Sequence, residues 1–247
     1  MMLKEAIDRI LSLSDPHIEM INGNQYADKP LTRIPNELRA EPLEVHTLSA
    51  VLDYLTSGAD DNIDQTDINR RFVLHVKDYD HVVLTRELDG DRRREELLVA
   101  KDDTSCYPFG RFLCVEDFII GMQSYFVQDE TVSALVKLVS NVTDGRSVQQ
   151  ADDGLTQSVT AKTGVVTQGK VDVPNPVLLR PLCTFSEIPQ PERRFVFRLR
   201  SGKEDGVLAA LFAADANAWK HEATLSIRDY FANELPEELR DDVIILA

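Results

Sequence analysis

The stretch that decides the fold is DDGLTQSVTAKT, residues 152–163, which lies within the strand-rich middle of the chain, residues 142–200. Its Asp-Asp-Gly opening is typical of a turn, and the residues after it partly alternate between apolar and polar types, with frequent threonine. This pattern predicts a turn that leads into a half-exposed strand. Because the sequence on either side is largely typical of helix, the middle segment sets the architecture.

Prolines are concentrated in the same part of the chain. Five of the eleven prolines fall between Pro174 and Pro191. Each proline lacks the amide N–H that a sheet ladder uses and has a fixed φ, so this segment must follow a sheet edge or a surface. Such a segment is well suited to pairing with another chain, and we therefore expect a homo-oligomer.

The composition is that of a globular protein. The chain has 247 residues, of which 43% are hydrophobic and 28% charged, enough for one large domain or two small ones. No apolar run approaches the roughly 20 residues that cross a bilayer, and the charged, amphipathic residues 1–13 are unlike a secretory signal. We expect a cytoplasmic protein that does not contact the membrane.

The formal net charge of −15 is unevenly distributed. It argues against direct nucleic-acid binding, which depends on Lys and Arg neutralising phosphates. Residues 141–200 nevertheless hold eight basic and six acidic residues and carry +2, against −11 in residues 1–140 and −6 in residues 201–247. If an anionic ligand binds, the middle segment is the most favourable place for it.

Local patterns predict both helices and antiparallel strands. Apolar spacing predicts helices over 3–11, 48–55, 115–122, 132–139 and 219–231, with Thr47 and Asp215 as caps of the second and the last. Strand and turn patterns predict a hairpin over 18–26, a meander over 72–100, a hairpin over 195–212 and a last strand over 243–246. We expect the helices over 115–139 to pack on the preceding meander.

These elements indicate an α+β fold, with antiparallel sheets, packed helices and a strand-rich, proline-rich middle segment. Helical periodicity changes to strand near residues 140–145. We expect an N-terminal α+β part over 1–140 and a strand-rich part with a C-terminal helix over 141–247, or one continuous domain across this boundary.

Two patterns imitate metal sites without completing them. Asp60, Asn62 and Asp64 resemble the start of a calcium loop, but its glycine and its bidentate glutamate are missing. His75 and His81 would offer imidazole ligands if a hairpin brought them together, although ordinary hairpin histidines are the simpler interpretation. The three cysteines show no Cys-x-x-Cys spacing. We predict no metal and no cofactor.

The candidate ligand-binding residues are Arg146, Asp152, Asp153, Gln157 and Arg180. The carboxylates could hold Mg²⁺ or accept hydrogen bonds from a ligand, and Arg146 could bind a phosphate. The alternative is a solvent-exposed turn whose aspartates accept from neighbouring backbone N–H groups. Arg180 lies in an apolar run, where a charged side chain usually meets a partner or an interface.

A resemblance to known proteins is carried by segments 45–55, 152–159, 173–181 and 195–198 and by Trp219. In these segments the chain resembles uncharacterised proteins of tailed phages and prophages, and it is similar to the YfdQ-like group. Members are often encoded near recombination genes, which implies a role inside the infected bacterial host. The resemblance implies no reaction and no catalytic residues.

We therefore expect a non-enzymatic phage accessory protein that self-assembles and binds a host protein or a small nucleotide, in counter-defence or in support of DNA metabolism. One alternative is a metal-dependent enzyme acting on nucleic acid or nucleotides, with Asp152 and Asp153 near His75 or His81. Another is an acidic DNA mimic that binds recombination proteins, suggested by the charge of −15.

Overall fold

A computed structural model describes residues 16–30, 39, 41–57, 71–90, 92–143, 147–152, 156–163, 166–201 and 206–247. The helix expected over 3–11 and the calcium-like residues 60–64 lie outside this range. Contacts between residues divide the chain into two compact units, Met1–Arg39 and Ala40–Ala247, and each is described by itself.

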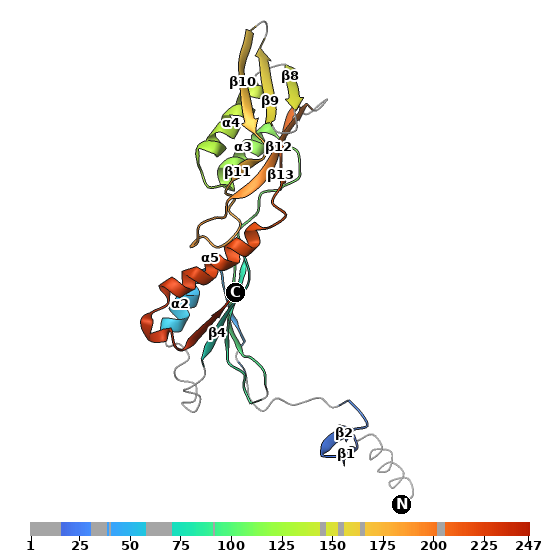
Figure 1. The fold of residues 1–247 in the computed structure, drawn as a ribbon, viewed down its shortest axis with the longest axis vertical. Coiled ribbons are helices and arrows are strands. Elements are labelled where there is room, and N and C mark those ends of the chain that lie inside the picture. The colour runs from blue at the N-terminus through green and yellow to red at the C-terminus, as the bar shows by residue number, and fades with distance from the viewer. Residues whose placement is uncertain are drawn as a thin grey trace, which may run out of the picture. The chain divides into compact units, whose positions relative to one another are not determined.

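The first unit contains the hairpin expected over 18–26. Strands β1 (Ile18–Ile21) and β2 (Asn24–Ala27) pair in antiparallel fashion (Figure 1). Asn22 and Gly23 join them with φ of 53° and 80°, the positive values that a tight two-residue hairpin turn needs. The Asn-Gly sequence therefore determines this turn.

The second unit contains a five-stranded sheet, in the order β14-β4-β5-β6-β3. Its strands are β3 (Leu43–Val45), β4 (Phe72–Asp78), β5 (His81–Arg86), β6 (Glu96–Lys101) and β14 (Val243–Leu246). The antiparallel β4-β5-β6 core confirms the expected meander. The two short edge strands each pair in parallel, β3 with β6 and β14 with β4.

Two helices cover one face of this sheet. They are α2 (Leu48–Ser57) and α5 (Trp219–Glu234), and a short 3₁₀ turn, η2 (Glu237–Leu239), leads from α5 towards β14 (Figure 1). Val51 of α2 and Phe231 of α5 are fully buried in the same cluster as Leu74 and Leu84 of the sheet. The apolar faces of the two helices and of the sheet thus pack together in one hydrophobic core.

The first turn of α2 receives two caps. Thr47 Oγ1 accepts from Ala50 N at 3.3 Å, as the sequence predicts. Glu187 Oε1 accepts from Leu48 N at 2.7 Å and from Ser49 N at 3.2 Å. A carboxylate at a helix N-terminus satisfies otherwise unpaired N–H groups and interacts favourably with the helix dipole.

The second unit also contains a four-stranded sheet, in the order β11-β12-β13-β7. Its strands are β7 (Leu113–Cys114), β11 (Val177–Leu179), β12 (Arg193–Ser201) and β13 (Val207–Ala213), and β12 and β13 confirm the hairpin expected over 195–212. One face packs on helices α3 (Val115–Ser124) and α4 (Glu130–Thr143).

The placement of α3 and α4 corrects an expectation. The sequence suggested that they pack on the β4-β5-β6 meander, but Phe118 and Met122 of α3 and Leu135 of α4 share a core with Phe195 and Phe197 of β12. The meander face that carries Leu74 and Leu84 is covered instead by α2 and α5. This core joins residues from both sides of position 140, so the boundary expected there does not separate two hydrophobic cores among the described residues.

The middle segment forms a three-stranded antiparallel sheet, in the order β10-β9-β8. Its strands are β8 (Ser147–Asp152), β9 (Thr156–Thr163) and β10 (Val166–Pro174). Strand β9 agrees with the strand expected after Gly154. The register of β10 against β9 shifts between Gln168 and Lys170, which marks a bulge.

The protein therefore has an α+β fold with largely antiparallel sheets. Among the helices that the structure describes, none combines the length and the apolar character that crossing a membrane requires.

Glu187→Ala should lower the free energy of unfolding by about 1–2 kcal/mol, because two backbone N–H groups of α2 lose a charged acceptor. Urea unfolding followed by circular dichroism measures this change. Glu192→Ala removes a carboxylate from an exposed residue and should change the stability by less than about 0.5 kcal/mol. Equal effects of the two substitutions would contradict the capping role.

Candidate functional site

A buried ion pair lies where β12 begins. Arg193 Nε donates to Asp215 Oδ2 at 2.7 Å and Arg193 Nη2 donates to Asp215 Oδ1 at 3.3 Å, so the contact is bidentate. The two side chains are only 6% and 9% exposed. A desolvated charge of this kind is stable only when it is paired and hydrogen-bonded.

Aromatic rings surround the same guanidinium group. Arg193 Cζ lies 4.6 Å from the ring centre of Trp219, 5.1 Å from that of Phe195 and 5.3 Å from that of Phe109. Phe195 belongs to the core under α3 and α4, whereas Trp219 begins α5. Arg193 therefore links the four-stranded sheet to the helix that covers the five-stranded sheet.

The turn before α5 is shaped to hold Asp215. Ala216 and Asn217 have φ of 48° and 64°, and Asn217 N donates to Asp215 Oδ1 at 3.2 Å. Asp215 was expected to cap α5, but the N-cap residue is Ala218 and it makes no side-chain cap. The carboxylate binds Arg193 instead, because a buried guanidinium requires a charged partner.

Trp219 joins a second set of contacts with the β4–β5 turn. Its ring lies 4.7 Å from that of Tyr79, edge to face, and Lys220 Nζ lies 4.4 Å above Tyr79. Thr184 Oγ1 donates to the carbonyl of Tyr79, next to the buried Cys183. Trp219 is 6% exposed, which agrees with its predicted role as a core residue.

The pKa values at this junction follow from burial and charge. Burial acts to raise the pKa of Asp215, but the hydrogen bonds from Arg193 and Asn217, with the charge of Arg193, bring it below its ordinary value. Burial raises the pKa of the Cys183 thiol to about 12. Cys183 is therefore a protonated packing residue at neutral pH and not a nucleophile.

A surface cavity of about 490 Å³ adjoins the ion pair. The residues that line it include Glu192, Arg194, Asp215, Trp219 and Glu222. The cavity thus combines three carboxylates with one arginine. Trp219 Nε1 is buried without a hydrogen-bond partner among the described residues.

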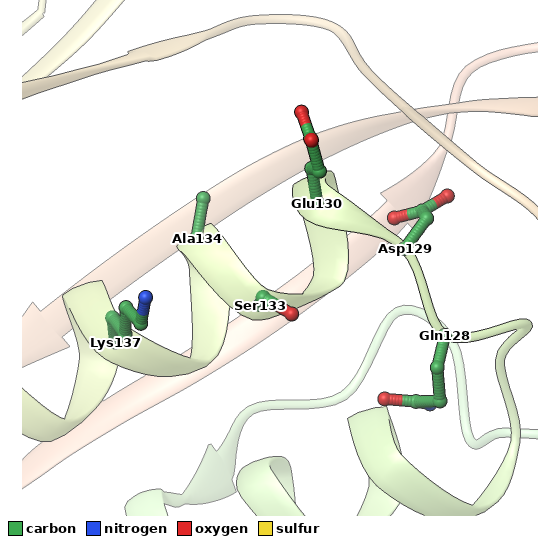
Figure 2. Close-up of a pocket in the computed structure, with 6 residues that line it drawn as sticks. All are labelled: Gln128, Asp129, Glu130, Ser133, Ala134 and Lys137. Atoms are coloured by element: carbon green, nitrogen blue, oxygen red, sulfur yellow. The ribbon is translucent and has the colours of Figure 1, made fainter.

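A second, more open hollow of about 520 Å³ runs along the first half of α4. Figure 2 shows Glu130, Ala134 and Lys137 on this helix, with Gln128 and Asp129 in the segment before it. Gln128 Nε2 donates to the carbonyls of Phe126 at 2.8 Å and Met122 at 3.0 Å. Because this side chain serves the local backbone, it gives the hollow no distinct ligand chemistry.

Arg180 lies beside the same hollow. Residues 180–182 run next to residues 125–127, with Val127 N donating to Arg180 O at 2.9 Å and Leu182 N to Tyr125 O at 2.8 Å. Arg180 Nη2 consequently lies 3.5 Å from Asp129 Oδ2. Asp129 Oδ1 also accepts from Val132 N at 2.9 Å and so caps α4. Arg180, the charged residue in the apolar run, is thus paired with Asp129.

The other predicted ligand-binding residues belong to the β8–β9 hairpin. Asp152 ends β8 and stands opposite Gln157 of β9 in the register, so the backbone brings these two positions together. Arg146 and Asp153 lie outside the described residues. The binding role of this group remains a prediction.

The histidines of the enzyme alternative lie on the five-stranded sheet. His75 of β4 stands opposite Val83, and His81 of β5 stands opposite Asp78 and Lys101. Within the described part of the chain, no three His, Cys, Asp or Glu side chains gather closely enough to hold a metal ion.

No family model, curated protein or solved structure matches this chain. The similarity to phage proteins therefore remains a prediction from the sequence.

The sequence reasoning missed Arg193 as the centre of a site. The sequence did indicate that Arg193 is buried. It lies an even number of residues before Phe195, Phe197 and Leu199, which all face the core, and residues at alternate positions of a strand share one face. An arginine in phase with core residues predicts a buried guanidinium that needs a partner. The identity of that partner, 22 positions further along the chain, left no sequence pattern.

Arg193→Met should lower the free energy of unfolding by about 3 kcal/mol, because it leaves the Asp215 carboxylate desolvated and unpaired. Arg194→Met is the matched control, since Arg194 is the exposed neighbour, and it should change stability by less than about 0.5 kcal/mol. Chemical denaturation of both variants measures the difference. A loss of similar size in both would show that burial of the ion pair is unimportant.

The ion pair should also give a pH-dependent stability. Since the pKa of Asp215 is lowered on folding, its contribution is complete above the ordinary carboxyl value of 3.8 and is lost as the pH falls through the lower folded-state pKa. The stability advantage of the wild type over Asp215→Asn should therefore shrink below about pH 4. Urea unfolding at a series of pH values tests this, and an advantage that stays constant down to about pH 2.5 would refute it.

Proposed function

We propose that this protein is a non-enzymatic binding protein that self-associates by pairing the β8 strands of two copies. The observation that carries this proposal is the open edge of the three-stranded sheet. In the order β10-β9-β8, β8 pairs with β9 on one side, and no other described strand pairs with its second edge. An unpaired edge is a template for another strand.

The other edge of this sheet carries features that hinder pairing. Strand β10 contains the bulge between Gln168 and Lys170 and ends at Pro174, and bulges and prolines are common protections of edge strands. The sequence of β8, SVQQAD, contains no proline, glycine or lysine. These differences favour β8 over β10 as the pairing edge.

Antiparallel pairing of β8 with a second β8 would be an isologous contact around a two-fold axis. It would extend the sheet from three strands to six across the dimer. Because the two strands would run in opposite directions, the Asp152 and Gln157 positions of the two copies would lie at opposite ends of the paired strands. Dimerisation would thus place one copy of the predicted ligand-binding group at each end.

The proposed role is that of a phage accessory protein acting in the infected bacterial cell. Its support is the sequence resemblance, together with the +2 charge of residues 141–200 in an otherwise acidic chain. We propose a host protein or a small nucleotide as the bound partner. The metal-dependent enzyme and the acidic DNA mimic remain alternative predictions.

Native mass spectrometry of the full chain purified from bacterial cells should show a discrete dimer. The same sample, once denatured, should release a stoichiometric small molecule if the partner is a nucleotide. A bare monomer at micromolar concentration would overturn self-association.

Two proline substitutions should identify the pairing edge. Successive residues of a strand direct their N–H groups to opposite edges, so of Gln149→Pro and Gln150→Pro one removes an outer donor and the other a donor to β9. We expect one variant to be a folded monomer and the other to lose thermal stability. Two folded dimers would exclude β8 as the interface.

A further inference from the structure

The four-stranded sheet has an outward face that contrasts with the rest of the chain. The register places nine strand positions on this face: Cys114, Leu178, Arg194, Val196, Arg198, Arg200, Leu208, Ala210 and Phe212. Three of the nine are arginine and none is acidic, although the whole chain holds 42 acidic and 27 basic residues. We call these positions, with Phe112, the arginine face.

The arginine face lies opposite the face that α3 and α4 cover. Phe195, Phe197 and Leu199 alternate with the outward residues of β12 and are buried in the core under these helices. Arg194 and Arg200 are exposed, and Leu178 of the neighbouring strand is 46% exposed. The face is therefore a surface of the described molecule, with both cationic and apolar groups.

Aromatic rings and guanidinium groups are interleaved on this face. Arg200 Cζ lies 4.0 Å from the ring centre of Phe112, and that ring lies 5.8 Å from the ring of Phe212. Phe112 and Phe212 are both partly exposed. Such an array offers charge to an anionic backbone and flat apolar surface to a planar ring.

We propose that the arginine face binds single-stranded nucleic acid. Arg194 and Arg200, the two exposed arginines of this face, lie about 20 Å apart along one strand, at roughly 3.3 Å per residue, and would contact phosphates of the bound chain. Phe112 and Phe212 would stack with unpaired bases, which a duplex does not expose on its surface.

The net charge of −15 does not prevent this binding. Salt screens charges beyond a Debye length of about 8 Å at physiological ionic strength, so groups on or beside the face dominate the local field. Glu192 and Glu222, which line a cavity with Arg194, reduce the positive field at that end of the face. The sequence argued against nucleic-acid binding from total charge, whereas the strand register gathers three arginines on one surface. This inference does not depend on self-association through β8.

Fluorescence anisotropy with a labelled oligo-dT of about 20 nucleotides tests the proposal on the full chain at physiological ionic strength, where charges far from the face are screened. The wild type should bind, and Arg194→Glu with Arg200→Glu should weaken binding at least about tenfold and reduce the salt dependence. Arg228→Glu makes the charge change of one of these two substitutions at an exposed residue of α5 and should leave binding unchanged. Circular dichroism and thermal unfolding confirm that each variant is folded.

A second variant separates stacking from charge. Phe212→Leu keeps an apolar side chain but removes the ring, so it should weaken binding about fivefold or more without changing the salt dependence. A duplex of the same length should compete poorly. Equal competition by the duplex, or an unchanged affinity of Phe212→Leu, would overturn the stacking role.

Three further results would overturn the proposal. They are no binding by the wild type, equal binding by the double arginine variant, and binding of polyglutamate in place of oligo-dT, which would indicate an acidic protein partner. Native mass spectrometry tests self-association through β8, and anisotropy tests binding of oligo-dT. Failure of one proposal can therefore be distinguished from failure of the other.

Discussion

The second unit depends on the burial of one guanidinium group. Arg193 is almost completely removed from water, so its charge must be compensated by Asp215 and by the faces of aromatic rings. The ion pair brings together the start of β12, the left-handed turn at Ala216 and Asn217, and the start of α5. It also connects the core under α3 and α4 with helix α5, because Phe195 of that core and Trp219 of α5 meet at the same cation.

The two unlike faces of the four-stranded sheet follow from the same constraint. Strand residues alternate between faces with a period of two, so placing Arg193 inward also places Phe195 and Phe197 inward and Arg194 outward. A register slip of one residue would bury the outward arginines without partners and expose the phenylalanines. The ion pair thus positions the arginine face without being part of it.

Much of the local structure could be predicted from the sequence. The meander β4-β5-β6, the β12–β13 hairpin and the Thr47 cap follow from alternation, helical spacing and turn residues within a few positions of one another. The pairing of the Asp152 and Gln157 positions across a short hairpin follows in the same way, and their binding role stays a prediction. In each case the deciding interactions are local, and local interactions leave a periodic pattern in one dimension.

By itself, then, the sequence determined the α+β class, the position of most strands and helices, and the acidic character of the chain. Only the tertiary structure decided which helices cover which sheet, that Glu187 caps α2 and that Asp215 binds Arg193 instead of capping α5. It also decided that three arginines of an acidic protein share one outward face of a sheet. The physical reason is that these contacts join segments far apart along the chain, where complementary charge and shape select the partner and no sequence period records the choice.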